Sequence, residues 1–375
     1  MRIVVLHGSN DSYGATRVLT QEVSCLVRLG HQVTVVVPDD GPLARELAHL
    51  GDSARVTVEP GLSVLRRSRL RDVLRRPRLS PEMVAADLVV LWTLALAAYV
   101  PVLRARRKPF YVSVHEILRG ALGGLLVRAL LAPGVFPVCV CSTAAADWLG
   151  VHGVRRGRIT VTFPIFEPVE RLATRAAHEP PTMAVVGRMN GRKGHLEVVR
   201  ALREGLPDGS PWHLLLCGAP FPGQEDALAD VLTAIGSDHR IEYRGEVPSL
   251  EAIAPEIDAV LCFPTKPEGF GLVPVEAWRL GLRAVGYADG GAAEVMRIVG
   301  GIAVARTDDA VSDIRTALTA LARAMRRGDA LAAPAVVNPL FRRQRREDSL
   351  RAVIGAALAG RPRHGSARPR VPAEH

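Results

Sequence analysis

The sequence predicts an α/β protein made of two doubly wound Rossmann-like domains that face each other across a cleft. Three observations predict it. Short apolar runs alternate with segments of helical periodicity, this alternation stops once and then restarts, and 375 residues are enough for two domains. Strands that are apolar throughout and separated by helices are typical of a parallel sheet covered on both faces.

The first domain is predicted over residues 1–170. Its compact apolar runs predict strands over 2–6, 32–37, 87–92, 110–114, 138–141 and 159–162. Apolar residues at helical spacing predict helices over 15–29, 42–50, 94–104 and 118–129.

A polar segment with two prolines, residues 171–181, predicts a linker. The second domain is then predicted over 182–338, followed by a C-terminal helix over 339–360 and a disordered tail over 361–375. Its strands are predicted over 183–186, 213–217, 241–243, 258–263, 283–287 and 301–304. Its helices are predicted over 194–203, 226–235, 274–280 and 313–326.

The charge balance favours an anionic partner. The net charge is +10, which suits nucleic acid, a membrane surface or a phosphorylated substrate. Only 5% of residues are aromatic, and neither aromatic residues interleaved with basic ones nor a base-reading helix is evident. We therefore expect no nucleic-acid partner.

Cysteine usage and hydropathy indicate a cytoplasmic protein. The five cysteines show no metal-ligand spacing, so we expect reduced, buried thiols. The first residues form a strand at once, without a signal-peptide pattern. The longest uncharged apolar run, residues 88–103, is short for a membrane span and contains Pro101.

The most informative segment is PEGFGLVPVEAWRLG, residues 267–281. Gly269 and Gly271 flank Phe270, so the backbone can approach a ligand closely there. The amides of Gly271 and Leu272 are expected at a helix N-terminus, which favours anions. An ordinary strand–loop–helix joint, whose Glu276 only complements the helix dipole, fits this segment equally well.

Three further loops follow predicted strands, where ligands gather in such sheets. VVGRMNGRKGH places Arg188 and Lys193 before a helix, and two cations there suit a diphosphate. HGSNDSYGA places Gly14 before another helix, although it lacks the dinucleotide fingerprint. VSVHE places His115 directly after a strand. Each of these residues has an ordinary structural interpretation when taken singly.

Together, these four loops resemble the retaining glycosyltransferases of family four, which have the GT-B fold. Glu268 and Glu276 match the family's signature of two glutamates separated by seven residues, and Arg188 and Lys193 match its phosphate-binding pair. ADGGAAEV, with Glu294, resembles the element that follows them. DSYGATRVL and GPLARELAHLG look like the opening of bacterial surface-polysaccharide members.

The resemblance implies transfer of a sugar from a nucleotide-diphosphate sugar to a hydroxyl acceptor with retention, without a metal or other cofactor. It places Glu276 on the ribose hydroxyls and Glu268 on the donor sugar, with His115 positioning the sugar and the attacking hydroxyl. The catalytic residues would be His115, Glu268, Arg188 and Lys193. The donor-binding residues would be Gly14, Arg188, Lys193, Glu268, Phe270, Gly271, Leu272 and Glu276.

Other interpretations stay open. A nucleotide-sugar epimerase shares this fold, and so would a non-catalytic sugar-nucleotide-binding protein. The basic stretches 65–78 and 103–108 have two interpretations: contact with an anionic membrane near a lipid-linked acceptor, on the inner face of the membrane, or a solvated charged surface.

Overall fold

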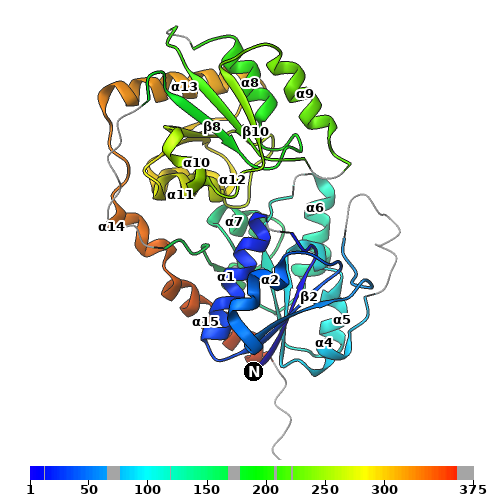
Figure 1. Cartoon of the computed structure of the whole chain (residues 1–375). Coiled ribbons are helices and arrows are strands. Elements are labelled where there is room, and N and C mark those ends of the chain that lie inside the picture. Colours follow the sequence, from blue (N-terminus) through cyan, green and yellow to red (C-terminus); the bar gives the residue numbers. More distant parts are fainter. Residues whose placement is uncertain are drawn as a thin grey trace, which may run out of the picture.

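The structure is a computed structural model that describes residues 1–11, 13–65, 77–118, 120–167, 178–206, 209–220 and 223–360. It contains two parallel sheets, each covered by helices on both faces. The two domains that they form lie one above the other in Figure 1. The predicted α/β fold with two Rossmann-like domains is confirmed. Most of the predicted linker and the whole predicted tail lie outside the described residues.

The first sheet has the strand order β3-β2-β1-β4-β5-β6-β7, and every pair is parallel. Its strands are β1 (Arg2–His7), β2 (Gln32–Val37), β3 (Ala54–Val58), β4 (Leu88–Trp92), β5 (Phe110–Val114), β6 (Val138–Val140) and β7 (Ile159–Val161). Its helices are α1 (Gly14–Arg28), α2 (Leu43–Leu47), α4 (Pro81–Ala85), α5 (Tyr99–Ala105), α6 (Ala121–Leu126) and α7 (Thr143–Val151).

The second sheet has the order β10-β9-β8-β11-β12-β13, again parallel throughout. Its strands are β8 (Thr182–Val186), β9 (His213–Cys217), β10 (Ile241–Gly245), β11 (Ala259–Cys262), β12 (Arg283–Tyr287) and β13 (Ile302–Val304). Its helices are α8 (His195–Arg203), α9 (Asp226–Ile235), α10 (Leu250–Ile253), α11 (Leu272–Arg279), α12 (Gly290–Val299), α13 (Ala310–Arg327) and α14 (Pro334–Val337).

Burial explains why the strands are apolar without alternation. All five residues of the central strand β4 are buried, as are those of β5, because helices pack on both faces of the sheet. The edge strand β3 differs: its residues ARVTV are only partly buried or exposed. A short, half-exposed edge strand gives a weak apolar signal, and the sequence analysis does not predict β3.

The C-terminal helix α15 (Arg343–Ala359) returns to the first domain and packs beside α1 (Figure 1). Arg346 of α15 and Glu22 of α1 form an ion pair of 2.6 Å, and both side chains are almost fully buried. The hydroxyl of Tyr111 donates to the same carboxylate at 2.6 Å. A buried charge is stable only with such partners, so this pair fixes where α15 lies on α1 and β5.

None of the helices in the described residues is both long and apolar enough to cross a membrane. All five cysteines are free thiols, and four of them are buried. Burial raises the pKa of Cys217, which borders the interdomain cleft described below, to about 11. Burial also raises the pKa of each of the other four thiols, so all five stay protonated near neutral pH.

Candidate active site

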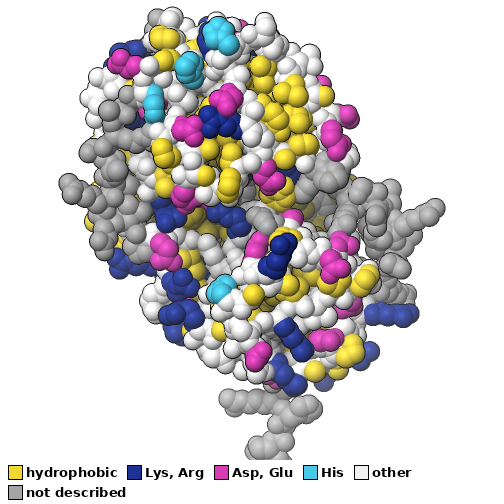
Figure 2. Space-filling view, in the orientation of Figure 1, with side chains coloured by type: hydrophobic (Ala, Val, Ile, Leu, Met, Phe, Trp, Pro, Cys, Tyr) yellow, Lys and Arg dark blue, Asp and Glu magenta, His cyan; other side chains and the backbone are white. Residues whose placement is uncertain are grey.

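A cleft of about 1190 Å³ lies where the carboxyl ends of the two sheets face each other. Its walls are the loops after β1 and β5 of the first domain and those after β8, β9, β10 and β11 of the second. Figure 2 shows basic and acidic side chains together at the level where the domains meet. In open parallel sheets, ligands bind at this end of the strands.

The loop after β8 brings two cations to the cleft. Lys193 lies just before α8, and its ammonium forms an ion pair with the Glu268 carboxylate. Burial alone would lower the pKa of Lys193, but Glu268 outweighs that effect and raises it. The guanidinium of Arg188 lies over the ring of Tyr13 from the first domain, 3.5 Å from the ring centre. The structure thus brings both predicted cations into the cleft.

The loop between β11 and α11 carries Glu268 and lies against the first domain. A Cβ atom on Gly269 would lie 2.0 Å from the carbonyl oxygen of His115, so only glycine permits this approach. Gly271 is the N-cap residue of α11 and has a left-handed conformation (φ 93°). Helix α11 therefore points its N-terminal amides, beginning at Leu272, into the cleft.

Phe270 borders the cleft, but its ring is buried between the domains. The ring centroid lies 5.7 Å from that of Phe163 and 6.3 Å from that of Phe341. Only 6% of the residue is exposed. A ligand in the cleft would therefore meet the backbone of Phe270 and not its ring.

Glu276 lies on the first turns of α11 and is held by a residue of the other domain. Its carboxylate forms an ion pair of 2.6 Å with Arg17 of α1. The Glu276 side chain is 10% exposed, whereas that of Arg17 is 55% exposed. A built Cβ on Gly14, the first residue of α1, would lie 3.1 Å from Leu272, so the N-termini of α1 and α11 nearly touch.

His115 faces these groups from the end of β5. Its Nε2 lies 2.9 Å from the hydroxyl of Ser113, and its ring packs on that of Trp92 with 4.2 Å between centroids. Burial, with smaller contributions from Arg346 and His7, lowers the pKa of His115 to about 3. The imidazole is therefore neutral near pH 7 and can donate and accept hydrogen bonds without carrying charge.

The sequence patterns do not predict two residues that line the cleft, Tyr13 and Arg17, as site residues. The carboxylate of Asp11 orders their loop, since it accepts hydrogen bonds from the Tyr13 amide at 3.0 Å and the Thr16 hydroxyl at 2.9 Å. Both residues flank the predicted Gly14, and Arg17 is one helical turn further along the same helix face. That spacing is the signal that could have identified them.

Glu294 lies outside the cleft and ties the domains together. Its carboxylate accepts hydrogen bonds from the amide and the hydroxyl of Thr143, each at 2.8 Å. Next to it, the Ser142 hydroxyl donates to the carbonyl oxygen of Gly269 at 2.5 Å. The N-terminus of α7 is thereby fixed to α12 and to the loop that carries Glu268.

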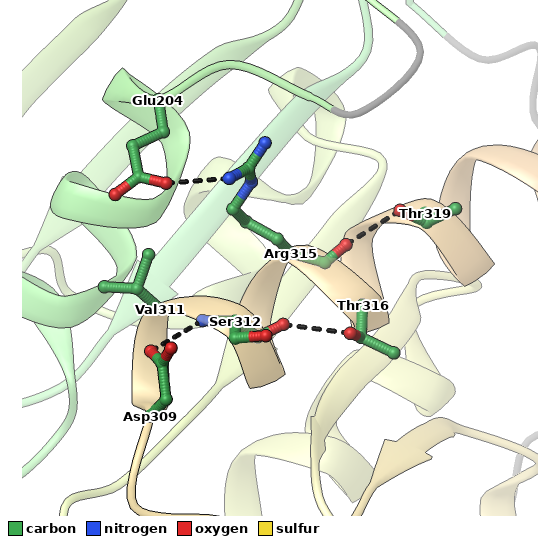
Figure 3. Close-up of a pocket in the computed structure, with 7 residues that line it drawn as sticks. All are labelled: Glu204, Asp309, Val311, Ser312, Arg315, Thr316 and Thr319. Atoms are coloured by element: carbon green, nitrogen blue, oxygen red, sulfur yellow. Dashed lines mark hydrogen bonds and ion pairs between the residues drawn. The ribbon is translucent and has the colours of Figure 1, made fainter.

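A second hollow, of about 550 Å³, lies on the outer side of the second domain between α8 and α13 (Figure 3). Its polar groups are bonded to one another: Arg315 pairs with Glu204 at 2.7 Å, and the Asp309 carboxylate accepts from the Ser312 amide at 3.0 Å. It contains none of the predicted site residues, so the interdomain cleft is the candidate active site.

Within the described residues, no group of three or more His, Cys, Asp or Glu side chains is arranged to hold a metal ion. The charged residues that line the cleft include the cations Arg17, Arg188, Arg192, Lys193 and Lys266, together with Asp11, Glu116, Glu246, Glu268 and Glu276. Those cations are arranged to meet an anionic ligand directly.

Two family descriptions match this chain. "Glycosyltransferase Family 4" matches residues 13–164, and "Glycosyl transferases group 1" matches residues 180–324. Together the two matches identify the chain as a glycosyltransferase similar to family four. The two matches divide between the two sheets, and the first begins at the loop that carries Tyr13 and Gly14.

The chain is similar to the lipopolysaccharide core biosynthesis mannosyltransferase LpcC of Rhizobium leguminosarum bv. viciae. The two are 33% identical over 127 residues, which are 32% of this chain and 36% of that protein. The match thus spans about a third of the length of this relative.

Solved structures share the whole fold. Anabaena Alr3699/HepE in complex with UDP has a TM-score of 0.75 and 19% identity, and the match covers 95% of this chain and 100% of that one. The lipopolysaccharide outer core galactosyltransferase WaaB has a TM-score of 0.65 and 13% identity, with 95% and 99% covered. The chain therefore has the GT-B fold that the sequence predicts.

Proposed function

We propose that the chain is a retaining glycosyltransferase that moves a sugar from a nucleotide-diphosphate sugar to a hydroxyl acceptor. The observation that carries this proposal is the meeting of Arg188, Lys193, Glu268 and the N-terminus of α11 with His115 in one cleft. The two family matches and the complex of HepE with UDP support it.

The reaction must stabilise the negative charge that grows on the departing diphosphate. Arg188 and Lys193 supply fixed positive charge, and the amides at the start of α11 add a favourable dipole. In the structure these cations contact Tyr13 and Glu268. The diphosphate of the donor would replace Tyr13 and Glu268 as the partner of these cations. The cations would then already be in place when charge develops on the leaving diphosphate.

The remaining roles follow from position. Glu276, on a helix, would hold the ribose hydroxyls, and Glu268, on the adjacent loop, would contact the donor sugar. The acceptor oxygen bonds to the anomeric carbon on the face from which the diphosphate leaves, and its proton passes to the departing phosphate oxygen. Neutral His115 would position the sugar and the attacking hydroxyl by hydrogen bonds.

A donor panel tests this function. Because a ligand that binds the folded state raises Tm, we expect one nucleotide sugar to raise it, and transfer to a hydroxyl acceptor to give a product with the donor's anomeric configuration by NMR. Inversion would contradict the retaining mechanism. Conversion of the donor to a free, altered sugar without an acceptor would indicate an epimerase, and binding with no conversion would indicate a sensor.

We propose that no metal ion takes part. Transfer is expected to persist in excess EDTA, because fixed cations and helix amides would do the work of Mg²⁺. Complete loss of activity in EDTA, restored by Mg²⁺ or Mn²⁺, would contradict this.

We also propose a cytoplasmic enzyme of cell-surface glycan or glycolipid synthesis that acts at an anionic membrane on a lipid-linked acceptor. The printed names of LpcC and WaaB refer to lipopolysaccharide. The basic residues of the proposed contact are Arg66, Arg67, Arg69, Arg71, Arg75, Arg76 and Arg78. All but Arg78 lie outside the described residues.

Vesicle binding tests the membrane contact. Each basic residue near an anionic surface contributes about 1 kcal/mol, and salt should weaken the attraction. Equal binding to neutral and anionic vesicles at low salt would count against it.

A further inference from the structure

Two side chains from the first turn of α1 reach across the cleft. Tyr13 lies under the Arg188 guanidinium, and Arg17 pairs with Glu276 at 2.6 Å. The Arg17 amide donates to the Tyr13 carbonyl oxygen at 2.9 Å, so the two residues are one helical turn apart on the same face. One face of α1 therefore contacts two residues to which donor binding is assigned above.

The Arg17–Glu276 pair differs from an ordinary surface ion pair. Glu276 is 8% exposed as a residue and borders the cleft together with Arg17. A buried carboxylate needs a partner, because an uncompensated charge is costly there. In the structure Arg17 is that partner, and a nucleotide whose ribose hydroxyls bind Glu276 would replace it.

Arg17 would then be a cation beside the ligand's phosphates. It lies one turn from Gly14, at the N-terminus of α1, and both residues border the same cleft as Arg188 and Lys193. A guanidinium binds phosphate oxygens in bidentate geometry. Helix α1 also directs its N-terminal dipole at this place.

We propose that Arg17 is a donor-binding residue supplied by the first domain. It pairs with Glu276 in the structure, and it pairs with the diphosphate of the donor once the ribose hydroxyls bind Glu276. This inference rests on the proposed function. Because Arg17 lies on the first domain and Glu276 on the second, the exchange couples donor binding to contact between the domains.

The exchange has a signature that a purely structural role would lack. A nucleoside must displace Arg17 but offers it no phosphate, so Arg17 opposes its binding. A nucleoside diphosphate displaces Arg17 and then rebinds it. Arg17→Ala should therefore weaken diphosphate binding and leave nucleoside binding equal or tighter.

The test is calorimetry of the full chain with UDP, GDP and ADP, followed by the nucleoside of whichever diphosphate binds. For Arg17→Ala we expect the Kd of the diphosphate to rise about tenfold, as for one lost charge-assisted contact. The Kd of the nucleoside should stay the same or fall. Arg17→Lys should restore part of the diphosphate affinity, because lysine keeps the charge without the bidentate geometry.

Arg28→Ala is a matched control. Arg28 lies on the same helix, is 60% exposed and pairs with Glu347, which is 8% exposed, so the two ion pairs have nearly the same setting. Arg28 lies at the far end of α1 and should leave the Kd of both ligands within about twofold of wild type.

Three results for Arg17→Ala would overturn the inference. Equal weakening of both ligands would mean a structural role. Tighter binding of both would mean that Arg17 only blocks the site, and unchanged binding of both would exclude it from the site. If wild type binds none of the three diphosphates, the proposed function itself fails, which is a distinct result.

Discussion

The domains meet in several places, and two of these have opposite chemistry. One is an interdomain core of buried apolar side chains, in which Phe341 and Phe166 pack on Phe270, Val275 and Trp278. The other is a pair of cleft contacts, Tyr13 with Arg188 and Arg17 with Glu276. The apolar region needs no ligand, whereas the charged groups of the cleft contacts can exchange partners with one. The apolar contacts therefore hold the domains together, whereas the charged cleft contacts are the ones that a substrate can replace.

The largest expected effect breaks the interdomain core. Phe341 is 2% exposed, and its ring lies 5.4 Å from that of Phe166 and 5.8 Å from that of Phe163. Phe341→Ala should lower the free energy of unfolding by about 3–5 kcal/mol, the usual cost of such a cavity, as measured by urea denaturation. Val336→Ala, at a residue that is 68% exposed, should change it by less than about 0.5 kcal/mol. A similar small loss for Phe341→Ala would show that this region does not hold the domains.

The next largest effect is on turnover and is expected from substitutions in the cleft. Arg188→Ala and Lys193→Ala should each lower kcat by about 10²–10³, the cost of one preorganised charge stabiliser, measured at saturating donor. Stability should change far less than in Phe341→Ala. Arg203→Ala is the control, since Arg203 is exposed and donates to the Ala234 carbonyl oxygen on the outer side of the domain. Near-normal kcat in a folded variant would remove that residue from the mechanism.

Acid should act on the loops that carry the cleft contacts. His7 lies behind the Thr16–Asp11 hydrogen bonds, and His195 begins α8 next to Lys193. Burial lowers the pKa of each to about 4 in the folded chain, against about 6.5 when unfolded. Between these values the unfolded state binds more protons, so the free energy of unfolding falls as pH falls from 6.5 to 4.

The slope should approach about 1.4 kcal/mol per pH unit for each of these imidazoles. Urea denaturation at pH 7, 6, 5 and 4 measures it, and His195→Gln should flatten the slope by one histidine's share. An unchanged slope in that variant would show that His195 titrates normally in the folded state.

Most of the fold could be predicted because it depends on local patterns. Apolar runs and helical spacing mark β1, β4 and α1 within one or two residues of their observed bounds. The sequence patterns do not predict strand β3 or the helices α4, α7, α10, α12 and α14. Strand β3 is an edge strand without a full apolar run, and the opening Gly-Gly of α12 hides its helical character. Both have weak local signals and are stabilised by neighbours distant in sequence.

The same difference between local patterns and contacts distant in sequence applies to the site. Resemblance selects Gly14 and His115 of the first domain and, through motifs that lie within single loops, the site residues of the second domain. It does not select Arg17 or Tyr13, whose partners are far away in the sequence. Arg346, at the start of α15, is buried against Glu22, 324 residues away. Pairings of this kind depend on how the domains pack and leave no local pattern.

Substitution of the two cleft glutamates tests whether the cleft is the active site and which part of the donor each glutamate contacts. Glu276 is 10% exposed on a helix and Glu268 is 26% exposed on a loop. A contact that holds the ligand equally in ground and transition states sets KM, whereas one that strengthens as the bond breaks sets kcat. We expect Glu276→Gln mainly to weaken binding of the donor and of the bare nucleoside diphosphate. We expect Glu268→Gln to bind the diphosphate almost normally but to transfer sugar poorly.

Calorimetry with the nucleoside diphosphate, run beside steady-state transfer for both variants, is the deciding measurement. Nearly normal diphosphate affinity with low kcat in Glu268→Gln, and lost affinity in Glu276→Gln, is the predicted result. The reverse pattern would show that the two roles are assigned the wrong way round. Normal transfer by both variants would contradict the assignment of this cleft as the active site.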